Sequence, residues 1–203
     1  MARYLRHRYE DQETEVFLIR HGATAGNLEK RYIGRTDEPL TQTACDQLQK
    51  ASFPEADAVV TSPLLRCRQT AALLYPEAEV TVCDGLRETD FGRFEGKNYR
   101  ELSGDADYQA WLDSSGTLPF PDGEDTFAFR DRCAAAFENV MSDPRFEGKK
   151  VAFVVHGGTI MAILERFSLP ESGFYDWQTV NGTGFRCFWN GNRLIEISPL
   201  KGE

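Results

Sequence analysis

Two of the three histidines occupy equivalent places in the chain, because each directly follows a short apolar run and directly precedes a glycine. Residues 16–19 lead into Arg20-His21-Gly22, and residues 151–155 lead into His156-Gly157-Gly158. Such runs are typical of buried strands in a parallel sheet. The carboxyl ends of those strands meet at one edge, where α/β folds bind ligands, so we expect both imidazoles in one crevice. Either histidine alone could equally be a buried structural residue.

Groups that could hold a phosphate occur beside these histidines. Arg20 ends the first apolar run, and Arg66 lies in the first turn predicted after the next strand, whereas Arg68 is typical of an exposed helix charge. Two guanidinium groups from neighbouring strand ends could grip one phosphate, because arginine binds phosphate oxygens in pairs. Asn27 could donate to the same oxygens. Gly157 starts a predicted helical region whose free N–H groups favour an anion.

A carboxyl group near a phosphate pocket could serve as a general acid, because its charged form is disfavoured there. Glu88 follows the third predicted strand and is the candidate. Asp84, Asp90 and Glu95 are local rivals, and spacing alone does not choose among the four.

The elements that must position these groups alternate along the chain, which indicates the α/β class and a three-layer α/β/α sandwich. Strands are predicted at 16–19, 57–61, 79–83 and 151–155, with a closing hairpin at 185–189 and 194–197. Helices are predicted at 41–51, 62–74, 105–112, 124–141 and 159–167.

Local signals define two of the helix starts and one apolar helix face. Thr41 is a plausible N-cap, and Ser62 followed by Pro63 is typical of a cap and first helical residue. In the helix predicted at 124–141, four residues are expected in the core: Phe127, Cys133, Ala134 and Phe137.

The domain organisation predicted is a polar lead-in at residues 1–15 and a single domain at 16–203. The lead-in has no apolar stretch and carries four acidic groups near its end, so it resembles neither a secretory signal nor a transit peptide. Residues 84–123 contain six glycines and are expected to form a small cap over the edge of the sheet.

Composition excludes several classes of partner. With 23 basic and 32 acidic residues the net charge is −9, so we expect no nucleic-acid partner, although an acidic protein can hold a positive pocket. No apolar run approaches the length of a membrane span, so no membrane partner is expected. Five cysteines without a C-x-x-C pair indicate neither a disulfide framework nor a zinc site, and favour the reducing cytoplasm. We expect no metal and no cofactor, and the sequence makes no prediction of the oligomeric state.

Six segments in order resemble the signature of the histidine phosphatase superfamily, the phosphoglycerate mutase-like proteins. Residues 20–27 (RHGATAGN) are similar to R-H-G-x-T-x-x-N, and residues 34–41 (GRTDEPLT) to G-x-x-D-x-P-L-T. The others are 62–70 (SPLLRCRQT), 88–96 (ETDFGRFEG), 121–124 (PDGE) and 155–158 (VHGG). The resemblance covers about residues 16–190. Asp125 and Val155 stand where the family often has serine, which leaves the expected site intact.

The resemblance implies a role for each matching residue. His21 would be the nucleophile that takes the phosphoryl group, and Glu88 the proton donor to the leaving group. The phosphate would be held by Arg20, Arg66 and His156, with the substrate site extending to Asn27, Gly34 and Gly157. It further implies a mostly parallel mixed sheet and chemistry that needs no metal.

Three other functions are weighed against a phosphomonoesterase acting through a phosphohistidine. A non-catalytic phospholigand-binding member should lack the nucleophile or the acid, but both positions are filled. A nucleotide-binding protein should carry G-x-x-x-x-G-K-[ST], which does not occur. A phosphoglycerate mutase would share the same site residues. Mutases of the family resemble one another in a long insertion and tail, so the 36 positions between Glu88 and Glu124 favour hydrolysis.

The cap segment suggests a small-molecule phosphate ester as the partner. Residues 91–96 and 108–111 look like those of bacterial α-ribazole phosphatases and their broad-specificity relatives. Four aromatic residues could pack against an apolar substrate body or form a core of the cap itself: Tyr99, Tyr108, Trp111 and Phe120.

Overall fold

The computed structural model describes residues 13–202, in which six strands alternate with six α-helices. The strands are β1 (Thr14–Arg20), β2 (Ala58–Thr61), β3 (Val80–Val82), β4 (Lys150–Val155), β5 (Thr183–Trp189) and β6 (Leu194–Lys201). The helices are α2 (Ala25–Leu28), α3 (Gln42–Lys50), α4 (Leu65–Leu74), α5 (Ala106–Asp113), α6 (Thr126–Met141) and α7 (Gly157–Phe167). Short 3-10 turns occur at Asp84–Leu86, Gly92–Phe94, Pro144–Phe146 and Phe174–Trp177.

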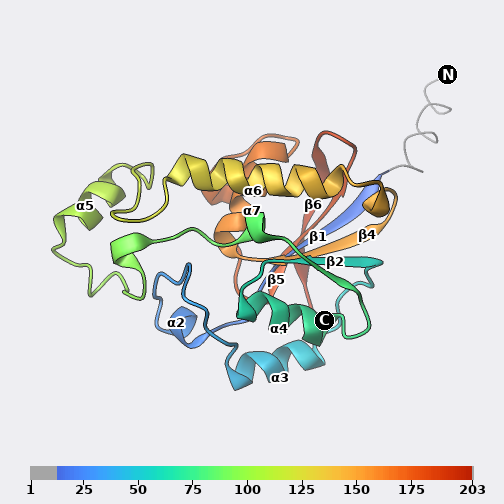
Figure 1. Cartoon of the computed structure of the whole chain (residues 1–203), viewed down its shortest axis with the longest axis horizontal. Coiled ribbons are helices and arrows are strands. Elements are labelled where there is room, and N and C mark those ends of the chain that lie inside the picture. Colours follow the sequence, from blue (N-terminus) through green and yellow to red (C-terminus); the bar gives the residue numbers. More distant parts are fainter. Residues whose placement is uncertain (1–12, 203) are drawn as a thin grey trace.

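The strands form one mixed sheet in the order β3-β2-β4-β1-β5-β6. β3, β2, β4 and β1 are parallel, whereas β5 runs antiparallel to β1, and β6 antiparallel to β5. α6 and α7 cover one face, while α4 and then α3 cover the other (Figure 1). The predicted α/β sandwich with a mostly parallel mixed sheet is therefore confirmed.

The central strand β4 explains why the layers hold together. Val151, Phe153 and Val155 pack into the apolar cluster beneath α6 and α7. Ala152 and Val154 point to the opposite cluster, beneath α4. All five are inaccessible to solvent, and burial of each larger side chain contributes roughly 1.5–3 kcal/mol. A strand buried on both faces reads as a continuous apolar run, which is what the sequence shows.

The segment predicted to form a cap contains α5 and two of the 3-10 turns. Figure 1 shows α5 at the end of the molecule toward which β1 runs, beyond the edge of the sheet. The segment has an apolar cluster of its own, made of buried Phe94, Leu102, Tyr108 and Phe120. No helix within residues 13–202 has the length and apolar character needed to cross a membrane.

Three helix starts differ from the sequence prediction by two residues or more: those of α4, α6 and α7. α4 begins at Leu65 behind an N-cap Leu64 that makes no side-chain cap bond, so Ser62 is not its cap. α7 begins at Gly157 with His156 as its N-cap, two residues earlier than predicted. The prediction for Thr41 is confirmed, since its hydroxyl accepts from the Ala44 N–H at the start of α3.

The apolar face of α6 is predicted correctly except at its first turn. Cys133, Ala134 and Phe137 are buried, but Phe127 is 54% exposed. Asp125 caps the helix by accepting from the N–H groups of Phe127 and Ala128, which starts α6 at Thr126 and turns Phe127 outward beside Arg130.

At the N-terminus, β1 already includes Thr14 and Glu15, which the prediction assigned to the polar lead-in. Residues 1–12 of that lead-in lie outside the described residues. The short helix α2 is not predicted from the sequence. Thr24 caps it, and the Asn27 side chain accepts in return from the Thr24 N–H.

Candidate active site

The two glycine-flanked histidines meet because β1 and β4 are neighbouring parallel strands in register. Arg20 lies opposite Val155, and the His21 N–H continues the ladder by donating to the Val155 carbonyl (3.0 Å). The His21 and His156 rings are consequently 5.2 Å apart between centroids, with an interplanar angle of 69°. The structure thus brings both histidines together at the carboxyl edge of the sheet.

His21 is held in one tautomer. Its Nδ1 lies 2.7 Å from the Gly22 carbonyl oxygen, which can only accept, so Nδ1 carries the proton and Nε2 keeps a lone pair. Burial holds the pKa of His21 well below its usual value, and the positive charges of Arg66 and Arg20 lower it further, against the Gly22 contact. The ring is therefore neutral near neutral pH, with Nε2 available to attack an electrophile.

Arg66 lies next to that nitrogen and is completely buried. Its Nε donates to His21 Nε2 (3.2 Å), while Nη1 donates to the Thr36 carbonyl (2.8 Å). Nη2 donates to the carbonyls of Gly34 (2.8 Å) and Ile33 (3.3 Å). The guanidinium is thus fixed by backbone oxygens, and a phosphoryl oxygen at His21 would compete for the Nε–H. Gly34 lies behind Arg66 and is not on the wall of the cavity.

The cavity itself is about 330 Å³ in volume, and Arg20, His21, Asn27 and Gly157 line its inner end. Arg20 Nη1 donates to the Thr179 carbonyl (2.6 Å), while its Nε is buried with no partner among residues 13–202. Asn27 Oδ1 accepts from the Thr24 N–H and from Asn181, which leaves its Nδ2 group as a donor. Gly157 adds the first N–H of α7, and such a group has no partner within the helix.

His156 forms the buried side of this inner end. Its Nε2 is 2.7 Å from the Ser62 hydroxyl, which explains what Ser62 does in place of capping α4. Burial keeps the pKa of His156 well below its usual value, with further lowering by Arg66, His21 and Arg20. His156 does not line the cavity. Any effect of His156 on a bound ligand therefore passes through the neighbouring His21 ring.

Glu88 is the carboxyl group that the structure places in the cavity. Its Oε2 accepts from the Gly158 N–H at the start of α7 (3.1 Å), and its Oε1 from the Thr89 N–H (3.1 Å). A side chain at Gly158 would collide with this carboxylate. Burial raises the pKa of Glu88 above its usual value, although the two N–H donors, Arg66 and Arg20 oppose the shift. A raised pKa favours the protonated form that a general acid needs.

The three rival carboxyl groups have other partners and do not line the cavity. Asp84 is exposed and pairs with Arg87. Asp90 pairs with Arg35. Glu95 accepts from the backbone N–H groups of residues 34 and 36. The geometry of the site therefore selects Glu88 as the candidate acid, whereas sequence spacing alone left four carboxyl groups.

The outer wall of the cavity is aromatic. Its rings are those of Tyr32, Phe91, Trp111, Phe120, Phe129, Phe174 and Tyr175. Of the four aromatics considered in the sequence, Trp111 and Phe120 line the cavity. Tyr108 is buried in the cluster of the cap, and Tyr99 is 50% exposed and off this wall. The interpretation as a core of the cap therefore holds for Tyr108 and Phe120, and packing against a substrate stays a prediction for Trp111 and Phe120.

Thr179 and Asn181 are site residues that sequence reasoning missed. Thr179 holds Arg20 through its carbonyl, and Asn181 Nδ2 donates to the His21 carbonyl (3.1 Å) as well as to Asn27. The predicted closing hairpin was the sequence feature that could have indicated these two residues. Its first strand, β5, runs antiparallel to β1, which brings the residues before β5 beside the end of β1. Among residues 13–202, no three His, Cys, Asp or Glu side chains gather as metal ligands would.

Comparison with known proteins agrees with this geometry. The chain is 30% identical over 174 residues to the uncharacterized phosphatase PhoE of Bacillus subtilis (strain 168), covering 83% of this chain and 84% of the relative. It is 29% identical over 207 residues to a 2,3-bisphosphoglycerate-dependent phosphoglycerate mutase of Rhizobium etli, covering 92% and 97%.

Among solved structures, the α-ribazole phosphatase of Shigella flexneri superposes with a TM-score of 0.73 at 25% identity, covering 85% of this chain and 89% of that one. Residues 16–193 match the sequence model of the histidine phosphatase superfamily (branch 1), a range that holds every residue of the cavity described above. The chain therefore belongs to the histidine phosphatase superfamily.

Proposed function

We propose that this protein hydrolyses a small phosphomonoester through a phosphohistidine on His21. The observation that carries the proposal is the His21 tautomer: Nδ1–H is fixed on the Gly22 carbonyl, and the basic Nε2 lies beside Arg66 at the inner end of the cavity. A neutral imidazole held this way needs no proton removal before it attacks phosphorus.

The reaction proceeds in two balanced steps. In the first, the Nε2 lone pair of His21 forms a bond to phosphorus, the ester P–O bond breaks, and the leaving oxygen takes the proton of Glu88. In the second, water attacks phosphorus while Glu88 takes its proton, and the P–N electron pair returns to Nε2. The same carboxyl group therefore acts first as acid and then as base.

Fixed positive groups supply the electrostatic stabilisation. Arg20, Arg66 and the start of α7 converge on the place where a phosphoryl group bound to His21 would lie. Donors already in place stabilise charge on the phosphoryl oxygens without reorganisation during the reaction. Because these groups already supply the positive charge, the proposed chemistry uses no metal and no cofactor.

The aromatic outer wall favours an ester with an apolar body, and α-ribazole 5′-phosphate is the proposed substrate. Its benzimidazole ring could pack on Trp111 and Phe120 while the phosphate reaches His21. Superposition with the Shigella flexneri α-ribazole phosphatase supports this proposal. Five free cysteines suit a reducing compartment, and we retain the cytoplasm as the proposed location.

The alternative is phosphoryl transfer of the phosphoglycerate mutase type, and the Rhizobium etli relative favours it. Because the alignment covers 97% of that mutase, chain length does not separate the two activities, and the argument from a short cap loses its force. The wall of the cavity favours hydrolysis instead. Arg31, a basic group on this wall, is already paired with Glu101 and Glu29 (both 2.6 Å) and is not free for a second carboxylate.

The test is a panel of phosphomonoesters with purified protein, including α-ribazole 5′-phosphate, 4-nitrophenyl phosphate and sugar phosphates. In parallel, 3-phosphoglycerate is incubated with 2,3-bisphosphoglycerate. We expect inorganic phosphate from the panel and no interconversion of phosphoglycerates. Efficient interconversion with little phosphate released from any monoester would establish the mutase reading.

A further inference from the structure

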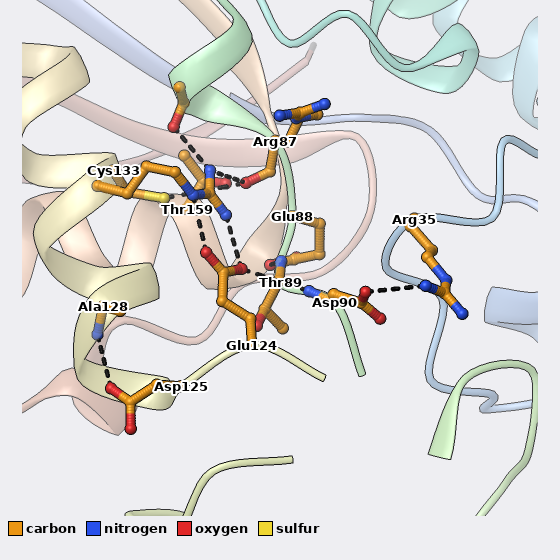
Figure 2. A network of polar contacts seen from close by, with 12 residues as sticks. Arg35, Arg87, Glu88, Thr89, Asp90, Glu124, Asp125, Ala128, Cys133 and Thr159 are labelled. Carbon is orange, nitrogen blue, oxygen red and sulfur yellow. Dashed lines mark hydrogen bonds and ion pairs between the residues drawn. The ribbon is translucent and has the colours of Figure 1, made fainter. Parts of the chain in front are cut away.

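An ion pair lies outside the cavity, next to the segment that carries Glu88. Arg132 on α6 and Glu124, two residues before that helix, meet through two parallel contacts: Nε to Oε1 (2.9 Å) and Nη2 to Oε2 (2.8 Å). Both side chains are about three-quarters buried, at 27% and 22% exposure. Figure 2 shows Glu124 between α6 and the segment that carries Glu88.

The pair reaches the chain on both sides of Glu88. Arg132 Nη1 donates to the carbonyls of Gly85 (2.9 Å) and Arg87 (3.1 Å). Glu124 Oε2 accepts from the Asp90 N–H (3.4 Å), and the Glu124 N–H donates to the Asp90 carbonyl (2.9 Å). The backbone is thus held directly before Glu88 and two residues after it, as the dashed contacts in Figure 2 show.

Apolar packing fixes the segment before Glu88 but not at Glu88 itself. Leu86 is fully buried in the core, whereas a hollow of about 480 Å³ lies against Glu88 on the side of Arg35, Asp90, Glu124 and Arg132. The segment 84–92 belongs to no strand or α-helix and contains only 3-10 turns. The backbone beside this hollow is held by the polar contacts of Arg132 and Glu124.

We propose that Glu124 and Arg132 are positioning residues that hold Glu88 at the distance and angle needed for proton transfer. The inference rests on the proposed function of Glu88 as the general acid. Proton transfer requires hydrogen-bond reach, and a displacement of about 1 Å can cost around 10²-fold in rate. Neither side chain of the pair lines the cavity. The Arg132 guanidinium lies over the Phe129 ring of the aromatic wall (5.3 Å to its centroid), whereas its hydrogen bonds run to Glu124 and to the segment that carries Glu88.

The test uses Arg132→Lys, which keeps the positive charge but loses the planar fork that contacts Glu124 and two carbonyls together. Two substrates with similar aromatic bodies separate the effects: 2-phenylethyl phosphate needs a protonated leaving group, and 4-nitrophenyl phosphate hardly does. We expect kcat/KM, which reports phosphoryl transfer to His21 and not the later attack of water, to fall about tenfold or more on the first and less than about twofold on the second. The Glu88→Gln/Arg132→Lys double variant should have the same kcat/KM as Glu88→Gln alone.

Two controls guard against a general structural effect. Arg186→Lys changes an arginine on β5 that pairs with Glu15 at the start of β1, the end of that strand away from His21, and should leave both substrates unaffected. Glu124→Gln keeps the size of the side chain and should show a milder form of the same leaving-group-dependent loss. Circular dichroism melts confirm that each variant is folded at the assay temperature. Equal loss on both substrates, or additive loss in the double variant, would overturn the proposal.

A measurement without turnover separates this inference from the proposed function. The titration of the Glu88 carboxyl, followed by carbon-13 NMR and assigned with Glu88→Gln, should move toward the usual glutamate range in Arg132→Lys. Arg20, Arg66 and the new lysine keep their charges, so the shift reports hydration of a displaced carboxyl. An unchanged titration would refute positioning. If Glu88→Gln alone shows no leaving-group dependence, the general-acid role fails instead.

Discussion

The inner end of the cavity and its outer wall are built in different ways. Arg20 ends β1, His21 and His156 directly follow β1 and β4, and the backbone ladder of these two strands fixes where they lie. The outer wall is assembled from loops and helices: three of its seven rings come from the segment 84–123, which forms one eight-residue helix and two 3-10 turns, and the others from the chain after α2, from α6 and from the 3-10 turn at Phe174–Trp177. Edge-to-face aromatic contacts hold that segment together, such as Phe94 on Tyr108 with centroids 5.4 Å apart.

This difference places the groups proposed for catalysis on the rigid sheet, and the groups proposed to select the substrate on a wall that can change its shape. Groups at strand ends are held by many backbone hydrogen bonds and cannot move without disturbing the sheet, as catalysis by fixed charges requires. A wall of packed side chains can change its shape without changing the sheet. We therefore expect changes at the inner end to lower turnover on every substrate, and changes in the wall to alter preference among substrates.

The largest effect should come from the inner end. His21→Ala removes the nucleophile, so activity should fall by at least ~10³-fold on every ester. Rapid quench of the unaltered protein should give an acid-labile phosphoryl group that maps to His21 in a digest. Label on a serine, aspartate or cysteine would contradict the assignment.

The next effect should depend on the leaving group. Glu88→Gln keeps the shape of the side chain but removes its acid, so kcat/KM for 2-phenylethyl phosphate should fall by about 10²–10⁴-fold. kcat/KM for 4-nitrophenyl phosphate should fall much less, because this parameter reports phosphoryl transfer to His21 and the nitrophenolate leaving group needs no proton. Equal losses on both would point to Asp90 or Glu95, or to misfolding, which a thermal melt would reveal.

The pH profile should carry the same signature, with rates changing by about tenfold per pH unit along a limb set by one proton. The pKa of His21 is lowered, so the nucleophile stays neutral well below pH 6.5. The pKa of Glu88 is raised, so the acid stays protonated above its usual range and is lost as pH rises further. kcat/KM for 2-phenylethyl phosphate, which reports the step that uses the acid, should therefore peak on the acid side of neutral and fall toward alkaline pH. A rate that rises steadily to pH 9 would exclude Glu88 as the acid.

The inner end was predictable from the sequence because local patterns specify it. An apolar run followed by His-Gly gives both the strand and the place where it ends, which suffices for His21 and His156. Glu88 was harder, since four carboxyl groups lie within twelve residues and the choice depends on Gly158, seventy positions away. Ser62 shows the opposite error: its local pattern is that of a helix cap, but a tertiary contact with His156 uses the hydroxyl.

The outer wall was predictable only as a list of aromatic residues. Whether a ring faces the cavity or the cap's own cluster depends on long-range packing. Trp111 and Tyr108 lie one turn apart on α5, stacked with centroids 6.2 Å apart, yet only Trp111 lines the cavity. Likewise, nothing local to Thr179 indicates that its carbonyl will hold Arg20, because that contact follows from the pairing of β5 with β1.

A smaller effect should come from the wall itself. Trp111→Ala removes apolar contact with the substrate body, and we expect KM for 2-phenylethyl phosphate to rise about tenfold, equivalent to ~1.4 kcal/mol. KM for glycerol phosphate, which has no ring, should hardly change. Tyr99→Ala is the matched control, because Tyr99 belongs to the same cap but lies off this wall. Equal rises for both substrates would mean that Trp111 supports the fold of the cap alone.

The smallest expected effect is that of chelation, which should leave activity unchanged. A metal in a phosphatase neutralises charge on the phosphoryl oxygens and activates water. In the proposed mechanism Arg20 and Arg66, which lie beside His21, neutralise this charge, and Glu88 activates water. A divalent ion placed between two guanidinium groups would also be repelled by them.

Protein dialysed exhaustively against EDTA should therefore turn over 4-nitrophenyl phosphate and 2-phenylethyl phosphate at the rate of untreated protein. Loss of activity on both, restored by one divalent ion, would show that the inner end is incomplete as described. Loss on 2-phenylethyl phosphate alone would point to an ion that assists the leaving group beside Glu88.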